Sequence, residues 1–196
     1  FLSPLAWAVL AVSLFILAYL FLTQIETYLT LQPRLAAIAG APGVADIVVA
    51  PLLAEAAVVL LLITPLITMR TLSEERRNRT LSLLLSAPVS MTEIVLGKYL
   101  GILSFFLILL ALLALMPLSL LAGTQLDLGK LAAGLLGLTL VVAAFSAIGL
   151  YMSSLTEQPT VAAVASFGLL LLLWIVDWAG STDAAGSSTL AQLSML

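Results

Sequence analysis

The sequence predicts an all-α bundle of helices that crosses a membrane several times. Of the 196 residues, 63% are hydrophobic and 9% are charged, whereas a soluble domain is about half apolar and about a quarter charged. Five apolar stretches are long enough to cross a hydrocarbon core as helices, which takes about 20 residues. They are too long and too uniformly apolar for barrel strands. We expect one transmembrane domain over residues 1–196, with spans at about 5–22, 47–68, 99–122, 131–152 and 161–178.

The residue types that are missing exclude several kinds of chemistry. The chain has no cysteine and no histidine, so it can form no disulfide, no thiolate metal site and no Ser-His or Cys-His arrangement. Its net charge is only −3, and it has no basic surface of the kind that binds nucleic acid. We therefore predict no catalytic residue, no metal site and no nucleic-acid partner.

Basic residues concentrate in one connection, which predicts the orientation in the membrane. Positive charge favours cytoplasmic loops, and five of the seven Lys and Arg residues lie between Arg70 and Lys98. We expect this connection in the cytoplasm, which by alternation of spans places the N-terminus there too. Trp174 and Trp178 then lie at the outer end of the fifth span, where aromatic rings favour the headgroup level. The predicted location is the inner (cytoplasmic) membrane.

The predicted outer segments differ in character. Residues 23–46 contain Pro33, Pro42 and several turn-favouring residues, for which we expect a short interfacial helix. Residues 180–189, GSTDAAGSST, are small and polar and predict a flexible connection. The chain then ends on LAQLSML, which is typical of the start of an apolar segment, so a sixth span is expected after Leu196.

Residues 70–98, between the second and third spans, predict two helix starts. Thr71 with Glu74, and Ser90 with Glu93, have the spacing of a capping box, in which side chains satisfy the free N–H groups of a first turn. The same segment is rich in charge in an otherwise apolar chain. We therefore expect short cytoplasmic helices here rather than an irregular loop.

A break separates these two helices. Glu75 and Arg79 have the spacing of a helical ion pair in the first helix. Pro88 disfavours a helical conformation at the residue before it, so the first helix should end near Ser86. From Met91 onward no breaker occurs before the third span. The second helix is therefore expected to be continuous with that span.

This segment admits two interpretations. In the first, the arginines only set the topology and the leucine face of the first helix lies on the lipid interface. In the second, the segment docks a partner, and a push on the first helix is transmitted into the membrane through the second helix. The pattern alone does not separate them.

Glu55 lies near the middle of the second span, where a charged side chain costs about 2.5 to 3.5 kcal/mol on insertion scales. It can face a translocation path or bind a proton, or it can be a protonated carboxyl that is hydrogen-bonded across a dimer interface. No other polar residue shares its helical face, which favours the structural interpretation. Pro51 and Pro65 bracket the same span and predict kinks that serve gating or packing.

Small and hydroxylic residues of the fourth span are best explained by packing. Gly134 and Gly137 offer a small-residue surface for close contact between helices. Hydroxyls in membrane helices usually hydrogen-bond to their own backbone or to a neighbouring helix. This is the expectation, with no further role, for Ser146, Ser153, Ser154 and Thr156.

The run MRTLSEERRNRTLSLLLSAPVSMTEIVLGKYLG, residues 69–101, resembles a known family segment. It contains Glu-Glu-Arg at 74–76, Thr80 followed by three leucines at 83–85, Ala-Pro-Val at 87–89 and Leu-Gly-Lys at 96–98. In these features it is similar to the segment between the second and third spans of ABC-2 type permeases, the membrane subunits of ABC transporters. The opening FLSPLAWAVL resembles the gliding-motility branch of that family, in which a basic amphipathic helix comes first.

The resemblance implies a six-span, type V exporter-like permease. It would pair with a second permease subunit, as a homodimer or a heteromer, on two cytoplasmic ABC ATPase subunits. In this family the cytoplasmic helix after the second span is a coupling helix that sits in a groove of the ATPase, which assigns that role to residues 74–86. The implied ATPase-coupling residues are Glu74, Glu75, Arg76, Arg77, Arg79, Thr80, Leu83, Leu84 and Pro88.

Two functions remain open from the sequence. The first is transport, driven by ATP and Mg²⁺ on the partner ATPase, because this chain has no G-x-x-x-x-G-K-[ST] motif and is expected to bind no cofactor itself. The second is mechanotransmission, in which the same cycle drives an extracytoplasmic partner. An intramembrane enzyme is disfavoured because Glu55 is the only membrane carboxylate. A secondary transporter is disfavoured because only the second span is bracketed by two prolines, without a matching span in the other half.

Overall fold

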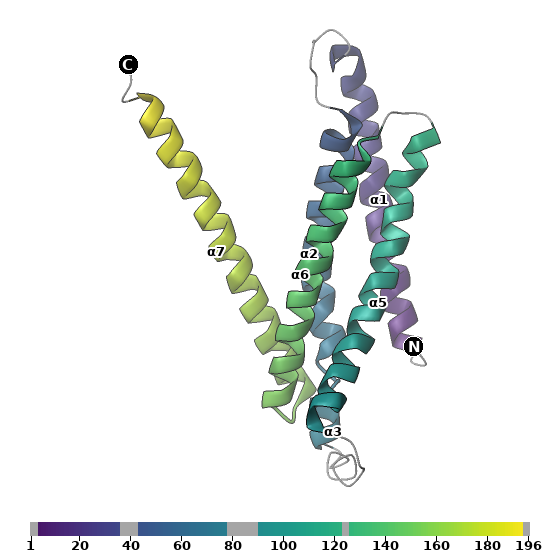
Figure 1. The fold of residues 1–196 in the computed structure, drawn as a ribbon, viewed down its shortest axis with the longest axis vertical. Coiled ribbons are helices and arrows are strands. Elements are labelled where there is room, and N and C mark those ends of the chain that lie inside the picture. The colour runs from purple at the N-terminus through teal and green to yellow at the C-terminus, as the bar shows by residue number, and fades with distance from the viewer. Residues whose placement is uncertain (1–3, 36–42, 78–89, 123–125, 194–196) are drawn as a thin grey trace.

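A computed structural model of the protein describes residues 4–35, 43–77, 90–122 and 126–193. These residues form helices and no strand (Figure 1), which confirms the predicted all-α fold class. Five helices are long and apolar enough to cross a membrane, judged by length and composition. They cover Ala6–Pro33, Ala45–Thr68, Met91–Ser119, Leu128–Leu155 and Pro159–Val176.

The chain reverses direction at each connection between long helices (Figure 1). The start of α1, the short helix α3 and the α6–α7 turn therefore lie at one end of the bundle, which we call the α3 end. The elements are α1 (Pro4–Leu35), a π-helical turn η1 (Ala45–Val49), α2 (Ala50–Thr68), α3 (Ser73–Arg77), α5 (Met91–Ser119), a 3-10 turn η2 (Leu120–Ala122), α6 (Leu128–Leu155) and α7 (Pro159–Leu193).

Helix α2 lies at the centre of the bundle. It contacts α1, α6 and α7, while α5 packs against α1 and α6. A larger share of the α2 span is buried than of any other described span. Helix α7 leans away from the other helices as it leaves the α3 end (Figure 1). A movement of α2 would therefore act on three neighbouring helices.

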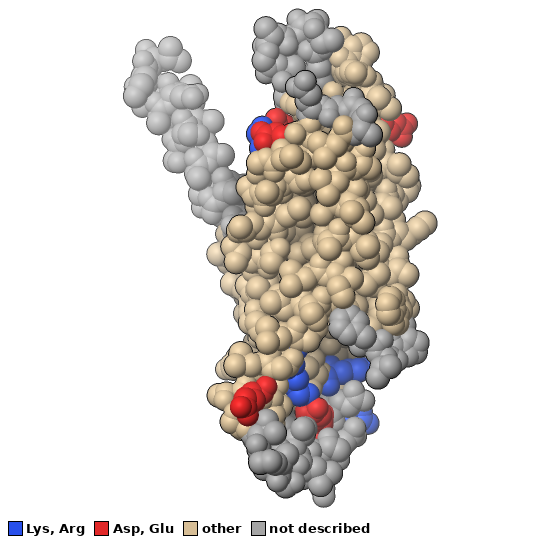
Figure 2. All heavy atoms as spheres, turned by 45° about the vertical axis from the view of Figure 1, so that its right-hand side comes forward, with Lys and Arg blue, Asp and Glu red and all other residues tan. Residues whose placement is uncertain are grey.

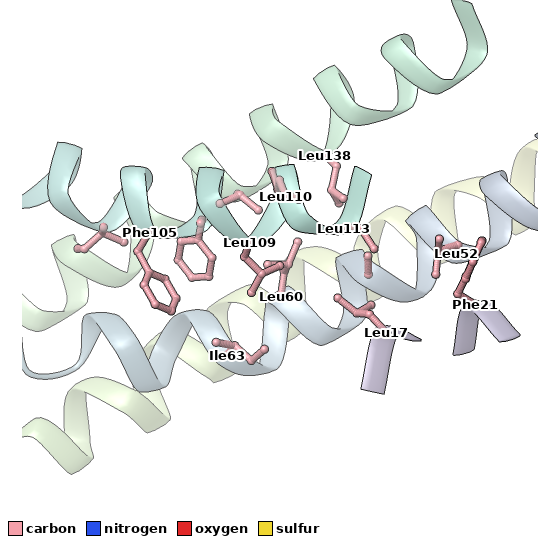
Figure 3. Close-up of a cluster of buried hydrophobic side chains, with 14 of the residues drawn as sticks. Leu17, Phe21, Leu52, Leu60, Ile63, Phe105, Leu109, Leu110, Leu113 and Leu138 are labelled. Atoms are coloured by element: carbon pink, nitrogen blue, oxygen red, sulfur yellow. The ribbon is translucent and has the colours of Figure 1, made fainter. Parts of the chain in front are cut away.

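Side chains from four helices meet in an apolar core (Figure 3). Leu17 of α1, Leu52 and Leu60 of α2, and Phe106 and Leu109 of α5 are fully buried. Lipid tails are as apolar as leucine, so burial from water does not drive association between spans in a membrane. Dispersion contacts in this closely packed core hold the helices together instead.

Charged side chains lie toward the two ends of the molecule, with an uncharged band between them on the face shown in Figure 2. At the end opposite α3, the ammonium of Lys130 lies 2.7 Å from Oδ1 of Asp46 and ties the start of α6 to η1. Both side chains are about half exposed, so the pair contributes little stability. The uncharged band is what a chain that crosses a bilayer requires.

The first helix is longer than predicted, and the expected separate interfacial helix within residues 23–46 is wrong as far as the described residues extend. Helix α1 continues without a break to Leu35, with Pro33 inside its last turn. The hydroxyls of Thr23 and Thr27 each donate to the carbonyl four residues earlier, at 3.0 and 2.9 Å. These bonds keep the threonine side chains on the helix backbone, so they do not compete with the helix as turn formers.

The last helix is also longer than predicted. Residues 180–189, expected to form a flexible connection, belong to α7, which continues to Leu193. This stretch contains alanine and no proline. A helix that is already formed adds residues at little cost, because only nucleation is unfavourable. The span that begins at Pro159 can therefore propagate through small polar residues.

The irregular part of the second span precedes Pro51. The π-helical turn η1 occupies Ala45–Val49, and α2 follows with Pro51 in its first turn. A proline cannot donate to the carbonyl one turn before it, and a π turn is a common way to accommodate a change in helical hydrogen bonding. Pro65 lies inside α2, which continues past it to Thr68.

Candidate functional site at the α3 end

The predicted ATPase-coupling residues fall partly within the described structure. Residues 74–77 belong to α3, where the side chains of Glu75 and Arg77 are described. The side chains of Glu74 and Arg76 lie outside the described residues, as does the predicted helix end near Ser86. The remaining predicted coupling residues also lie outside them, namely Arg79, Thr80, Leu83, Leu84 and Pro88.

Lys98 joins α5 to α3. Its ammonium donates to Oε1 of Glu75 at 2.5 Å and to the backbone carbonyl of Thr71 at 2.6 Å. The Lys98 and Glu75 side chains are 19% and 27% exposed, and a charge pair that is partly shielded from water is stronger than a fully exposed one. Next to it, the Tyr99 hydroxyl donates to the carbonyl of Ala143 in α6 at 3.1 Å. The start of α5 is thus bonded to both α3 and α6.

Ser153, in the last turn of α6, caps the start of α3. Its Oγ accepts hydrogen bonds from the N–H groups of Leu72 and Ser73, each at 3.1 Å. Its hydroxyl also donates to the carbonyl of Met69 at 3.1 Å. A helix start leaves such N–H groups without an intrahelical partner, and here a distant helix provides one. The hydrogen-bonding capacity of this buried hydroxyl is therefore used in both directions.

One of the two predicted capping boxes is present. Oγ of Ser90 accepts from the N–H of Glu93 at 3.3 Å, and Oε2 of Glu93 accepts from the N–H of Ser90 at 2.8 Å. Helix α5 then runs unbroken into the third span, which confirms the predicted continuity. The predicted cap at Thr71 is wrong. Its hydroxyl donates one turn back to Ile67 at 3.5 Å, and α3 begins later, at Ser73, under the Ser153 cap.

Close packing of α6 on α2 supports this cap. Thr68 is fully buried, and a Cβ built on Gly149 would lie 2.3 Å from its Oγ1, closer than real Cβ atoms come. Only glycine allows this approach. Of the predicted packing glycines, Gly134 faces Leu53, whose Cδ1 lies 2.4 Å from a built Cβ. Gly137 has no such atom within 4 Å, so close contact within this chain is confirmed for Gly134 and not found for Gly137.

Glu55 is hydrogen-bonded within the chain. Its Oε1 accepts from Nε2 of Gln24 at 2.9 Å, so α1 supplies the polar partner that the helical face of Glu55 lacks. Its Oε2 is buried without a hydrogen-bond partner among the described residues. The bond supports the structural interpretation of Glu55, with the difference that the partner found is a neighbouring helix of the same chain.

Two residues that organise the α3 end, Ser153 and Lys98, are not among the predicted coupling residues. No sequence pattern pairs position 153 with the start of α3, because their contact depends on how α6 packs on α2. Lys98 did offer a signal, since it is a single cation one turn before a long apolar run. The described residues hold no group of three His, Cys, Asp or Glu side chains able to bind a metal ion.

Comparison with protein-family models relates the chain to a known family. No curated protein and no solved structure matches the chain. A family model described as ABC-2 family transporter protein matches residues 39–192. This range includes α2, α3, α5, α6 and nearly all of α7, together with Glu75, Lys98 and Ser153. The protein therefore belongs to the ABC-2 transporter family and is a membrane-spanning permease subunit of an ABC transporter.

Proposed function

We propose that this permease belongs to an ATP-driven exporter, and that α3 with the residues after it receives the movement of a cytoplasmic ABC ATPase subunit. The observation that carries the proposal is the Lys98–Glu75 ion pair, which bonds a five-residue helix outside the apolar band to the first turns of a membrane span. A cytoplasmic helix without such a bond would move independently of the span.

The mechanism needs no reaction on this chain. ATP and Mg²⁺ bind to the ATPase partner, and ATP favours one of its conformations, which supplies the free energy for the change. A displacement of α3 acts on α5 through Glu75 and Lys98, and on α6 through the Ser153 cap. Helices are stiff along their axes, so a displacement at the α3 end moves the inner half of both spans.

The proposed orientation places the α3 end in the cytoplasm, with the N-terminus on the same side of the inner membrane. Arg70, Arg76, Arg77 and Lys98 lie in elements at this end, whereas Arg34, in the last turn of α1, and Lys130, at the start of α6, lie at the other. Excess positive charge favours the cytoplasmic side. The charge distribution of the described residues therefore supports this orientation.

The proposed assembly contains a second permease subunit, identical or different, beside this one on a pair of ATPase subunits. Membership of the gliding-motility branch rests on the opening residues 1–10, which precede the matched residues 39–192. It is retained as a proposal on that resemblance.

Mechanotransmission is the second candidate, and one observation favours it. Helix α7 continues from Pro159 to Leu193 as one helix, through the small and polar residues 180–189, on the side opposite α3. A helix that extends beyond the membrane offers a binding surface to an extracytoplasmic partner. In sealed vesicles, ATP turnover that depends on such a partner, with no solute crossing, would favour this candidate over export.

An exchange of charges tests the proposed coupling. In the reconstituted full-length complex, Lys98→Glu or Glu75→Lys alone should remove most of the ATPase stimulation that the permease provides, because each change places two like charges together. The double exchange should restore part of it, because it re-forms the pair in reverse. The matched control is the exchange at the other end, Asp46→Lys with Lys130→Asp, which should leave stimulation unchanged. If the single variants stimulate as well as the natural protein, the proposed coupling is wrong.

A further inference from the structure

An open hollow of about 830 Å³ lies at the α3 end, between the α2–α3 turn and the α6–α7 turn. Arg70 and Arg77 line it from one side, and Glu157, Gln158 and Thr160 from the other. Both arginines are exposed, and neither guanidinium forms an ion pair with a described residue. The hollow is therefore a polar cavity with two cations available to a ligand.

The hollow lies where apolar spans end, which is the depth at which lipid headgroups are expected. Arg70 comes directly after the apolar span that ends at Thr68, and Thr160 lies in the first turn of the α7 span. Two guanidinium groups and the carboxylate of Glu157 leave one net positive charge, which complements the single negative charge of a phosphodiester. The planar fork of arginine donors also matches phosphate oxygens in geometry.

A shallow apolar face of α7 continues from the hollow. The space along this face has a volume of about 360 Å³ and is lined by Thr160, Val161, Val164 and Ala165, so Thr160 borders both spaces. Val164 is 73% exposed in the apolar part of the helix. A soluble anion would gain nothing from contact with this apolar face. A polar hollow next to an apolar helix face matches the charged headgroup and the apolar chain of a phospholipid.

We propose that the α3 end binds one anionic phospholipid, with its phosphate between Arg70 and Arg77 and one acyl chain along Val161 and Val164. Basic cavities between spans at the membrane surface recognise anionic headgroups through the same charge complementarity. Arg77 belongs to α3 and Val164 to α7, so the lipid bridges these two helices. This site is distinct from the Lys98–Glu75 pair and goes beyond the coupling role.

Lipid binding to the full-length protein tests the proposal without any transport assay. The purified protein in detergent is titrated with phosphatidylglycerol, and bound lipid is counted by native mass spectrometry. We expect one saturable lipid. Each of Arg70→Gln and Arg77→Gln should weaken lipid binding about fivefold, because each removes the attraction of one basic residue for an anionic lipid. Lys130→Gln, the same change at the other end, should bind as the natural protein does.

Three further measurements distinguish an anionic phospholipid from other ligands and from misfolding of the variants. Arg70→Lys with Arg77→Lys keeps both charges but loses the forked donors, so it should bind more weakly than the natural protein and more tightly than the glutamine variants. Binding at this intermediate level shows that the loss in the glutamine variants is not misfolding. Phosphatidylethanolamine, which has no net charge, should bind more weakly. Glycerophosphoglycerol, the headgroup without acyl chains, should compete poorly. The proposal is overturned if the glutamine variants bind normally, if the uncharged lipid binds equally, or if the soluble headgroup competes as well as the lipid.

Discussion

Oγ of Ser153 lies 3.1 Å from the backbone nitrogen of Ser73, so the last turn of one membrane span caps the first turn of a helix outside the membrane. The two residues are 80 positions apart in sequence. Together with the Lys98 ion pair from α5, this bond gives α3 two attachments to the bundle. A short helix of five residues is marginal by itself, so its position is set by these attachments.

Removal of the cap should loosen the start of α3. Ser153→Ala leaves the N–H groups of Leu72 and Ser73 without their acceptor, a loss comparable to removing a helix N-cap, about 1 kcal/mol. We expect faster amide hydrogen exchange at these two residues, measured by mass spectrometry. Ser154→Ala is the control, because that hydroxyl donates only to the nearby carbonyl of Tyr151. Equal exchange in the two variants would contradict the cap.

The contact of Gly149 with Thr68 predicts that a single methyl group is destabilising. Gly149→Ala places a Cβ 2.3 Å from Oγ1 of Thr68, and such overpacking costs about 1 to 3 kcal/mol. The midpoint of thermal unfolding in detergent should fall. Gly137→Ala, on the same helix with open space around it, should be neutral or stabilising, because alanine is the better helix former. A Gly149→Ala protein as stable as Gly137→Ala would refute the close approach of α6 to α2.

The Gln24–Glu55 hydrogen bond predicts a non-additive pair of substitutions. Gln24→Leu removes the described partner of a buried carboxyl, which costs about 1 to 3 kcal/mol. When Glu55→Leu is added, the unpaired group disappears, so the double variant should be more stable than Gln24→Leu alone. The free energy of unfolding of both variants is measured in mixed micelles. Losses that simply add would mean that the bond contributes nothing, and would reopen a functional role for Glu55.

Features that depend on neighbouring residues in the sequence were predicted well. The five spans follow from length and composition, because lipid leaves few alternatives to a helix. The Ser90–Glu93 capping box and the continuity of α5 follow from residues within one turn of each other. Glu75 was correctly placed on a short helix, although the cap at Thr71 from which that helix was predicted is wrong.

Features that depend on contacts between helices were missed. The ion pair of Glu75 with Lys98 was not predicted, while the predicted partner Arg79 lies outside the described residues. Ser153 and Gly149 are ordinary residues of an apolar helix until α6 is placed against α2. The helix ends in α1 and α7 were misjudged because glycine, proline and polar residues near a helix end do not stop a helix that is already formed.

The most direct test of the account is whether the segment after α3 touches the ATPase. The natural chain has no cysteine, so Thr80→Cys provides a single attachment point for a photoactivated crosslinker in the predicted coupling segment. In the full-length complex we expect it to capture the ATPase subunit, with a yield that changes when ATP is added. Leu128→Cys, at the opposite end of the bundle, should capture none. If Thr80→Cys reacts only with lipid while the complex stays intact, this segment does not carry force from the ATPase.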